Sequence, residues 1–200
     1  MLKKNVQWLF YFVLMLSIII GCRVASVQQF YCKENTVSFP LELSGQWLSD
    51  EFSLFLDKDK TVISSLKTKD KQNIIYPVFF KIDKTLFVDV SLGYNSEIEP
   101  LPKGYLLIPC HVLFRIYYSN NEFSATPLSA EWINDQVKRN LIEIPHVVVK
   151  NPTNEKESDF LFTASPEQWS HVLKNCATIP EAFKYKIVFK RVDAPAKKMK

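Results

Sequence analysis

Histidine has the widest choice of chemistry in this chain, because an imidazole can ligate a metal or act as a general base near neutral pH. A zinc site needs three or four converging ligands, and His111, His146 and His171 share no metal-binding spacing. No serine lies in a Gly-x-Ser-x-Gly turn, and Cys110 and His111, as neighbours on a strand, point to opposite faces. We therefore expect no metal site, no cofactor and no catalytic activity.

The N-terminus carries a targeting pattern. Lys3 and Lys4 precede an almost uncharged apolar run over residues 6–20. A helix of about 15 residues covers roughly 22 Å, which is short of the roughly 30 Å hydrocarbon core of a bilayer. The run therefore predicts an export signal rather than a permanent span.

The run ends in Ile19-Ile20-Gly21-Cys22, which resembles the bacterial lipobox. The resemblance implies that residues 1–21 are removed and that Cys22 becomes the lipidated N-terminal residue, held on the membrane by several acyl chains. Because Arg23 rather than Asp follows, it also implies the outer membrane, facing the periplasm, in a Gram-negative host. The alternatives are an ordinary signal peptide and an uncleaved signal anchor.

Beyond Cys22 the chain has three cysteines, an odd number for an exported protein. A Cys110–Cys176 disulfide would join a helix to a sheet, whereas a bridge from Cys32 to either would tie down the N-terminal segment. Cys110 and Cys176 also fall on apolar faces, where a thiol packs as a small hydrophobic group. One bridge and one free thiol is the simplest arrangement, and the pairing stays open.

Composition narrows the class of protein. The 200 residues are 47% apolar and 14% aromatic, which supports one main folded domain. The four glycines form neither a Walker loop nor a dinucleotide-binding fingerprint. The formal net charge of +4 falls by two, to +2, once Lys3 and Lys4 are removed, so we expect no nucleic-acid partner.

The dominant hydrophobic period from residue 39 onward is two, which is typical of half-buried strands. The longest such stretch, 105–118, has an apolar face that includes Cys110, and His111, Arg115 and Tyr117 on the opposite face, suited to solvent or to the wall of a polar cavity. Further strands are predicted, with a short Asp83-Lys84 connection, at residues 45–47, 52–56, 74–82, 86–92, 122–126, 144–150, 159–163 and 185–192.

Two helices are predicted among the strands. Ser165-Pro166-Glu167-Gln168 has a capping serine, a proline at the first helical position and a glutamine at the third, and apolar residues follow at helical spacing through 166–176. The second helix, at about 129–140, has an apolar and a charged side. Each would pack on a sheet.

These elements predict a mainly β (α+β) fold, as an antiparallel β-barrel or a curved sheet with two packed helices. Gly45-Gln46-Trp47 on the first strand resembles the Gly-x-Trp motif of lipocalins and related calycins. In that family the tryptophan closes one end of the barrel against a basic residue of the last strand. Lys190 or Arg191 has a comparable position, and we assign Arg191 to the motif with Gly45 and Trp47.

We thus expect a signal peptide at 1–21, a lipidated tether at 22–38, a lipocalin-like domain at 39–193 and a basic tail at 194–200. The leading hypothesis is a membrane-anchored envelope lipoprotein that binds a hydrophobic or amphipathic small molecule in its barrel without catalysis. The alternative is a structural or interaction lipoprotein with a filled barrel, whose surface binds an envelope protein or a toxin.

Overall fold

A computed structural model describes residues 24–58, 61–65, 72–91, 110–151 and 154–192. Within these ranges the protein is mainly β, with two α-helices and a curved, mixed sheet of eleven strands. The predicted signal peptide, Cys22, the first part of the predicted 105–118 strand and the basic tail lie outside the described residues. The strands are β1 (Ala25–Ser26), β2 (Gly45–Leu48), β3 (Phe52–Leu56), β4 (Thr61–Ser65), β5 (Gln72–Ile82), β6 (Thr85–Ser91), β7 (His111–Tyr118), β8 (Glu122–Pro127), β9 (His146–Asn151), β10 (Asn154–Phe162) and β11 (Ile187–Arg191).

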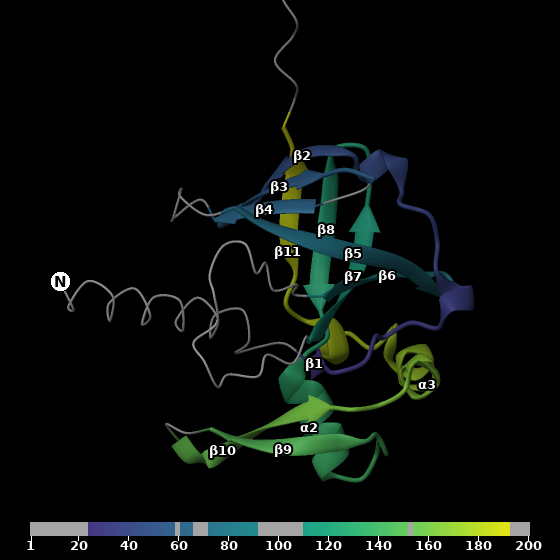
Figure 1. Ribbon diagram of the computed structural model, residues 1–200, viewed down its shortest axis with the longest axis vertical. Coiled ribbons are helices and arrows are strands. Elements are labelled where there is room, and N and C mark those ends of the chain that lie inside the picture. Colours follow the sequence, from purple (N-terminus) through teal and green to yellow (C-terminus); the bar gives the residue numbers. More distant parts are fainter. Residues whose placement is uncertain (1–23, 59–60, 66–71, 92–109, 152–153, 193–200) are drawn as a thin grey trace, which may run out of the picture.

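Eight of these strands form a ring of antiparallel pairings, which we call the ring. Pairing runs from β2 through β3, β4, β5, β6, β7 and β8 to β11, and β11 pairs again with β2. These strands occupy the upper part of Figure 1. Each strand of the ring therefore has a hydrogen-bonded neighbour on both sides.

The remaining three strands extend the sheet away from the ring. Ala25 and Ser26 pair with Val112 and His111 at the start of β7, where β8 no longer pairs. Strand β10 pairs parallel with β1 and antiparallel with β9, which is the edge strand. Figure 1 shows β9 and β10 in the lower part of the molecule, with β1 between them and the ring.

Alternating side chains divide the buried apolar residues into two cores. Strands on all sides of the ring contribute to the first, which we call the inner core, so it fills space inside the ring. Its buried members are Leu43, Trp47, Leu54, Leu56, Phe79, Leu86, Val88, Val90, Ile116, Phe123 and Phe189.

The second core, the outer core, lies on the opposite face of β5, β6 and β7, where Phe80, Phe87 and Leu113 point outward. Helices α2 (Ala130–Lys138) and α3 (Pro166–Cys176) cover this face with Ile133, Trp169 and Leu173, among others. Strand β6 is consequently buried on both faces from Leu86 to Val90. That explains why its sequence is a near-continuous apolar run.

The segment at 24–38 belongs to this fold, which corrects the predicted tether. Val24 is 2% exposed and Phe30 is fully buried in the outer core. The Phe30 amide donates to Asp89 Oδ2 at 3.0 Å, and the Val37 amide donates to the Phe79 carbonyl at 2.9 Å. Mixed polarity made this stretch resemble a linker, because its partners lie 40 or more residues away in sequence.

The two helices lie where the sequence predicts them. Ser165 caps α3 in a capping box with Gln168, and Ser129 caps α2 by accepting from the Trp132 amide. Strands β1 and β4 were not predicted. No helix in the described ranges is long and apolar enough to cross a membrane.

Candidate functional site

One end of the ring is closed by an indole and a guanidinium. Trp47 on β2 is fully buried, and its Nε1 donates to the Leu43 carbonyl at 2.8 Å, within the 3-10 turn Leu41–Leu43. The Arg191 guanidinium lies over the Trp47 ring at 4.3 Å from its centroid, a cation–π contact. Phe123 meets the same ring edge to face at 4.9 Å. The two residues that the sequence analysis joined in one motif therefore contact each other.

Arg191 is also hydrogen-bonded through all three of its nitrogens. Nε donates to the Asn120 carbonyl and Nη1 to the Ser44 carbonyl, each at 2.9 Å, and Nη2 donates to the Glu42 carbonyl. Gly45 has φ +126°, and a Cβ there would stand 3.2 Å from Arg191 Nη1. Glycine is therefore favoured by the backbone angle, and a Cβ at this position would also crowd the arginine.

The other end of the ring leaves inner-core side chains partly exposed. Ile187 lies four residues before Arg191 on β11, about 13 Å along the strand, and pairs with Ala125. Ala125 pairs in turn with Ile116 on β7. Phe114, two residues earlier on the same strand, points with Ile116 into the ring. Ile187, Ala125 and Phe114 pack against the inner core and are only partly buried. Over the described residues, Trp47 is thus fully buried at one end of the interior, whereas Phe114, Ala125 and Ile187 stay partly exposed at the other.

Thr61 places an unpaired polar atom inside the ring. It pairs with Leu56 and Ile75, both of which contact the inner core, so its side chain shares their face. The residue is 2% exposed, and its Oγ1 has no hydrogen-bond partner among the described residues. A buried hydroxyl without a partner costs about 1–3 kcal/mol. Thr61 was not predicted from the sequence, because one threonine at the start of a strand has no distinctive pattern.

An aspartate–histidine pair links the N-terminal segment to the ring. Asp89 on β6 is 1% exposed, and its Oδ1 accepts from His111 Nδ1 at 2.9 Å. Such a pair is the base half of a nucleophilic triad. The hydroxyl paired with His111 across the sheet belongs to Ser26, which is fully buried and accepts from Trp169 Nε1 at 3.1 Å. The contacts therefore fix chain segments together and do not present an accessible nucleophile at Ser26.

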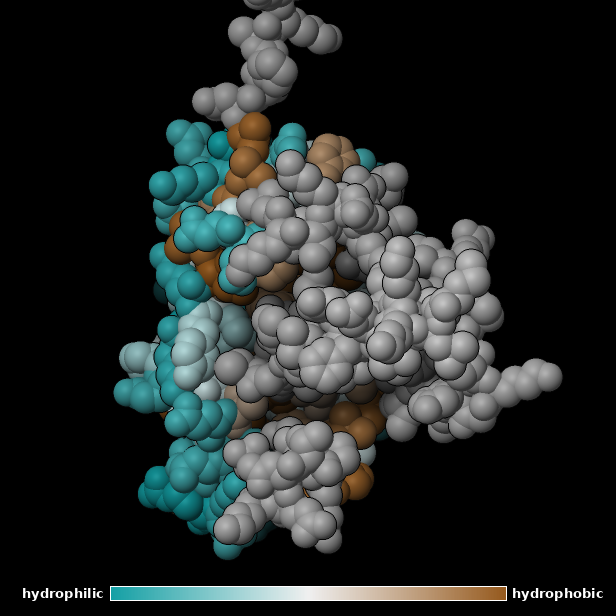
Figure 2. All heavy atoms as spheres, turned by 90° about the vertical axis from the view of Figure 1, so that its left-hand side faces the viewer, coloured by the Kyte–Doolittle hydropathy of each residue, from teal (hydrophilic) through white to brown (hydrophobic). Residues whose placement is uncertain are grey.

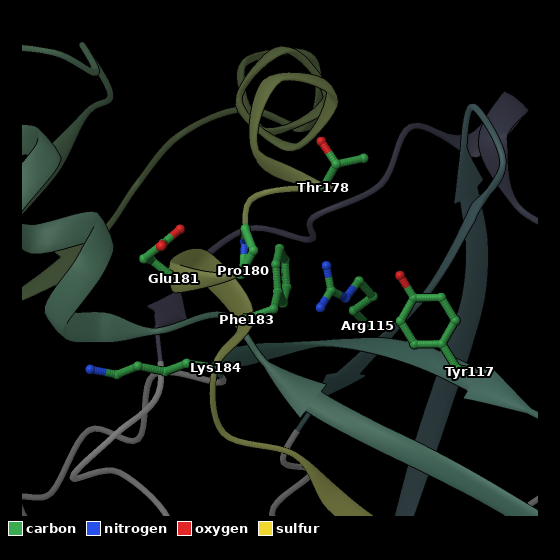
Figure 3. A pocket seen from close by; sticks show the side chains of 7 residues that line it. All are labelled: Arg115, Tyr117, Thr178, Pro180, Glu181, Phe183 and Lys184. Carbon is green, nitrogen blue, oxygen red and sulfur yellow. The ribbon is translucent and has the colours of Figure 1, made fainter.

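Arg115 lines a surface pocket of about 620 Å³ at the junction of β7 and the 3-10 turn Glu181–Phe183. Its guanidinium lies 4.5 Å from the ring centroid of Phe183 and 5.2 Å from that of Tyr117, and Nη1 donates to the Ala177 carbonyl at 2.6 Å. Figure 3 shows Arg115 between these two rings. Arg115 and Tyr117, which the sequence placed on one face of the strand, thus both line this surface pocket.

The pocket leaves the arginine charge without a carboxylate partner among the described residues. Its Nε is buried and makes no hydrogen bond there. Lys184 on the pocket rim pairs with Glu131 instead, and Figure 3 shows Lys184 and Glu181 directed away from Arg115. An anionic group with a flat apolar surface is the chemistry that complements this recess.

The cysteines that the structure describes form no disulfide with one another, neither Cys110 with Cys176 nor Cys32 with either. Cys176 is 1% exposed in the outer core, and burial raises the pKa of its thiol to about 12. Burial likewise raises the pKa of Cys32, with smaller contributions from Glu34 and Glu167. These thiols pack as small hydrophobic groups. The lipidation residue, Cys22, lies outside the described chain.

The histidines stand apart from one another. His111 pairs with Asp89, His146 donates from Nδ1 to the Ile144 carbonyl at 2.8 Å, and His171 is exposed on α3. Over the parts of the chain that the structure describes, no three His, Cys, Asp or Glu side chains gather as a metal site would require.

Comparisons with protein-family models, with curated proteins and with solved structures gave no match for this chain.

Proposed function

We propose that this protein is a bacterial envelope lipoprotein, anchored through Cys22, that binds a hydrophobic or amphipathic small molecule inside a calycin-like barrel without catalysis. In a Gram-negative host it would be held on the outer membrane, facing the periplasm. The anchor follows from the lipobox resemblance at residues 19–22. The closed set of strand pairings in the ring and its apolar interior are the basis for proposing a barrel that binds a ligand.

Three features support the calycin-like assignment. The ring has eight antiparallel strands, and one of its ends is closed by Trp47 against Arg191 of the last strand. Gly45 permits the close approach of that arginine. The helix α3 precedes the last strand of the ring, and a helix followed by a terminal strand is a further feature of lipocalins.

The buried Thr61 hydroxyl is the observation that most directly supports the proposed ligand. An apolar interior with a buried hydroxyl that lacks a partner among the described residues is complementary to a largely hydrophobic molecule that has a polar group. Partly exposed Phe114, Ala125 and Ile187 at the end opposite Trp47 mark where such a molecule would enter. A tightly packed structural core would gain stability from valine at position 61.

Native mass spectrometry of the full mature protein, extracted in detergent, tests this proposal. We expect an added mass that is present under native conditions and lost on denaturation. The N-terminal segment must be kept, because Val24 and Phe30 belong to the outer core. A natively folded protein with no added mass would overturn the ligand proposal.

Thr61→Val locates the ligand within the ring. The substitution conserves shape and removes the hydroxyl, so we expect ligand occupancy to fall several-fold while the protein stays folded. Thr36→Val is the matched control, since Thr36 Oγ1 donates to the Lys33 carbonyl at the surface. Equal occupancy in wild type and Thr61→Val would show that the ligand does not use this hydroxyl.

The Arg115 pocket favours a second candidate, in which the surface of the protein binds an envelope protein or a toxin. An arginine between two aromatic rings, with no acidic partner among the described residues, suits an acidic side chain or a terminal carboxylate of a protein partner. Pull-down from detergent-solubilised membranes tests it. We expect Arg115→Met to lose the captured partner and the exposed Arg139→Met to keep it, whereas capture by both variants would exclude the pocket.

A further inference from the structure

The described residues cover one face of the sheet extension and leave the other partly exposed. Ser26 and Phe162 are neighbours in the register and point into the outer core, where they are at most 1% exposed. The alternate residues Ala25, Leu161 and Val147 form a row across β1, β10 and β9 on the other face. Val147 is 54% exposed, and Ala25 and Leu161 are partly exposed. We call this row the apolar row.

Strand β9 extends the exposed apolar surface along the sheet edge. Val148 and Val149, which follow Val147, are 53% and 46% exposed. In Figure 2 apolar side chains reach the surface near the upper end and in the lower part of the molecule, the part that holds β9 and β10 in Figure 1. An edge strand with exposed valines on both faces invites association unless something covers it.

The attachment point of the chain lies close to this row. Ala25 is three residues from Cys22, and a fully extended chain spans at most about 3.6 Å per residue, so the two Cα atoms are within about 11 Å. Val24 is already buried, which leaves Cys22 and Arg23 as the only link. Two strand spacings, about 10 Å, separate Ala25 from Val147. A lipid on Cys22 would therefore hold the apolar row next to the bilayer.

We propose that the sheet extension docks on the bilayer that anchors Cys22, with Val147 at the level of the lipid headgroups. This inference rests on the lipidation proposed above. Docking is shallow, because the edge of β9 carries backbone groups that need water or headgroup partners and cannot enter the hydrocarbon core. It defines an orientation in which the extension meets the membrane and the ring projects away from it.

Fluorescence quenching on vesicles tests the docking. The full-length lipidated protein would be reconstituted in phosphatidylethanolamine–phosphatidylglycerol vesicles, with an environment-sensitive dye on Val147→Cys in a Cys110→Ser background. Tyr76→Cys on β5 is the matched control, since Tyr76 is 59% exposed on the ring. Spin-labelled lipids should quench the dye at position 147 several-fold more than the dye at position 76.

The outcomes separate this inference from the proposed anchor. Mass spectrometry of the same sample reports whether Cys22 carries the lipid. A lipidated protein with equal quenching at positions 147 and 76 overturns the docking and leaves the anchor intact. A protein without lipid on Cys22 overturns both. Dye–dye self-quenching at position 147 without quenching by lipid would instead assign the valines to a contact between two copies.

Discussion

The inner and outer cores are each centred on a fully buried tryptophan, but the two indoles depend on the chain in opposite ways. Trp47 donates to the carbonyl of Leu43, four residues earlier, whereas Trp169 donates to the hydroxyl of Ser26, 143 residues away. The first contact forms within a turn and the strand that follows it. The second forms only when the N-terminal segment has returned to the sheet. The Trp47 indole is thus held by a local contact before Arg191 arrives from the last strand, whereas the Trp169 indole depends on a partner distant in sequence.

That difference determines what the N-terminal segment does. In the outer core, Phe30 lies 4.5 Å from the Trp169 ring, and its amide is bonded to the buried Asp89. The same segment bears the proposed lipid anchor three residues before β1. A pull on the anchor would therefore act on the outer core through Val24 and Phe30, and on the edge of the ring through the pairing of β1 with β7.

The largest expected effect comes from Phe30→Ala. Truncating a fully buried phenylalanine costs about 3–5 kcal/mol of the free energy of unfolding, while a residue in a tether would cost nothing. Urea denaturation of the mature chain measures it. Phe55→Ala is the control, because Phe55 is 46% exposed on β3 and should cost less than about 1 kcal/mol. If both variants lose the same unfolding free energy, Phe30 does not stabilise the outer core and the segment is a tether, as the sequence predicted.

Arg191→Met tests the closed end of the ring. The variant keeps an apolar stem but removes the cation–π contact with Trp47 and the hydrogen bonds to three carbonyls, so we expect a loss of about 2–3 kcal/mol. The shift of the urea midpoint would be compared with that of Arg139→Met. Arg139 is 62% exposed in an ion pair with Asp135 and should change stability by less than about 1 kcal/mol. Similar shifts would show that the arginine does not close the ring.

Local patterns account for most of what could be predicted from the sequence. Period-two alternation located β3, β5, β6 and β7, and a turn signal or β-branched and aromatic bias located β8 to β11. Ser165 with Gln168 located the start of α3, and the resemblance of Gly45–Trp47 to a lipocalin motif led to Arg191. Each signal depends on neighbours in sequence or on one motif. Strand β1 has only two residues, and β4 begins with Thr61 and ends in serines, so neither alternates clearly.

The features that were not predicted depend on partners distant in sequence. Asp89 lies in an apolar run, where it reads as a solvent-facing position until Phe30 and His111 are placed beside it. The unpaired Thr61 hydroxyl and the recess around Arg115 likewise exist only after the ring and α3 have packed. The contact of Trp47 with Arg191 could therefore be predicted from a sequence motif. The unpaired Thr61 hydroxyl and the pocket around Arg115 could be found only from the structure.

Asp89→Asn tests how the two cores are joined. The amide keeps one acceptor for the Phe30 N–H but replaces the carboxylate that accepts from His111, so we expect a loss of about 1–2 kcal/mol. Urea denaturation gives the loss, and hydrogen exchange at the Phe30 amide shows whether that bond is retained. Asp135→Asn, at a 54% exposed position, is the control. A neutral Asp89→Asn would mean that the buried carboxylate adds nothing to the junction.

The smallest effect is a pH dependence specific to the outer core. Burial raises the pKa of Cys176 from 9.0 to about 12, so the unfolded chain loses this proton at lower pH than the folded protein. Between about pH 9 and 12 the unfolded state binds fewer protons, and stability falls as the pH rises through that window. Below pH 9 the contribution of the thiol is complete.

Cys176→Ala isolates this contribution, because the cavity that it leaves costs the same at every pH. From pH 8 to pH 10, the wild type should lose about 1 kcal/mol more than the variant in urea denaturation. Cys110→Ala is the comparison. Burial also raises the pKa of Cys110, but its thiol is only partly buried, whereas that of Cys176 is buried in the outer core. If wild type and Cys176→Ala lose stability in parallel, then the outer core opens enough at high pH to ionise the thiol, and the long-range contacts of Trp169 are weaker than those that close the ring at Trp47.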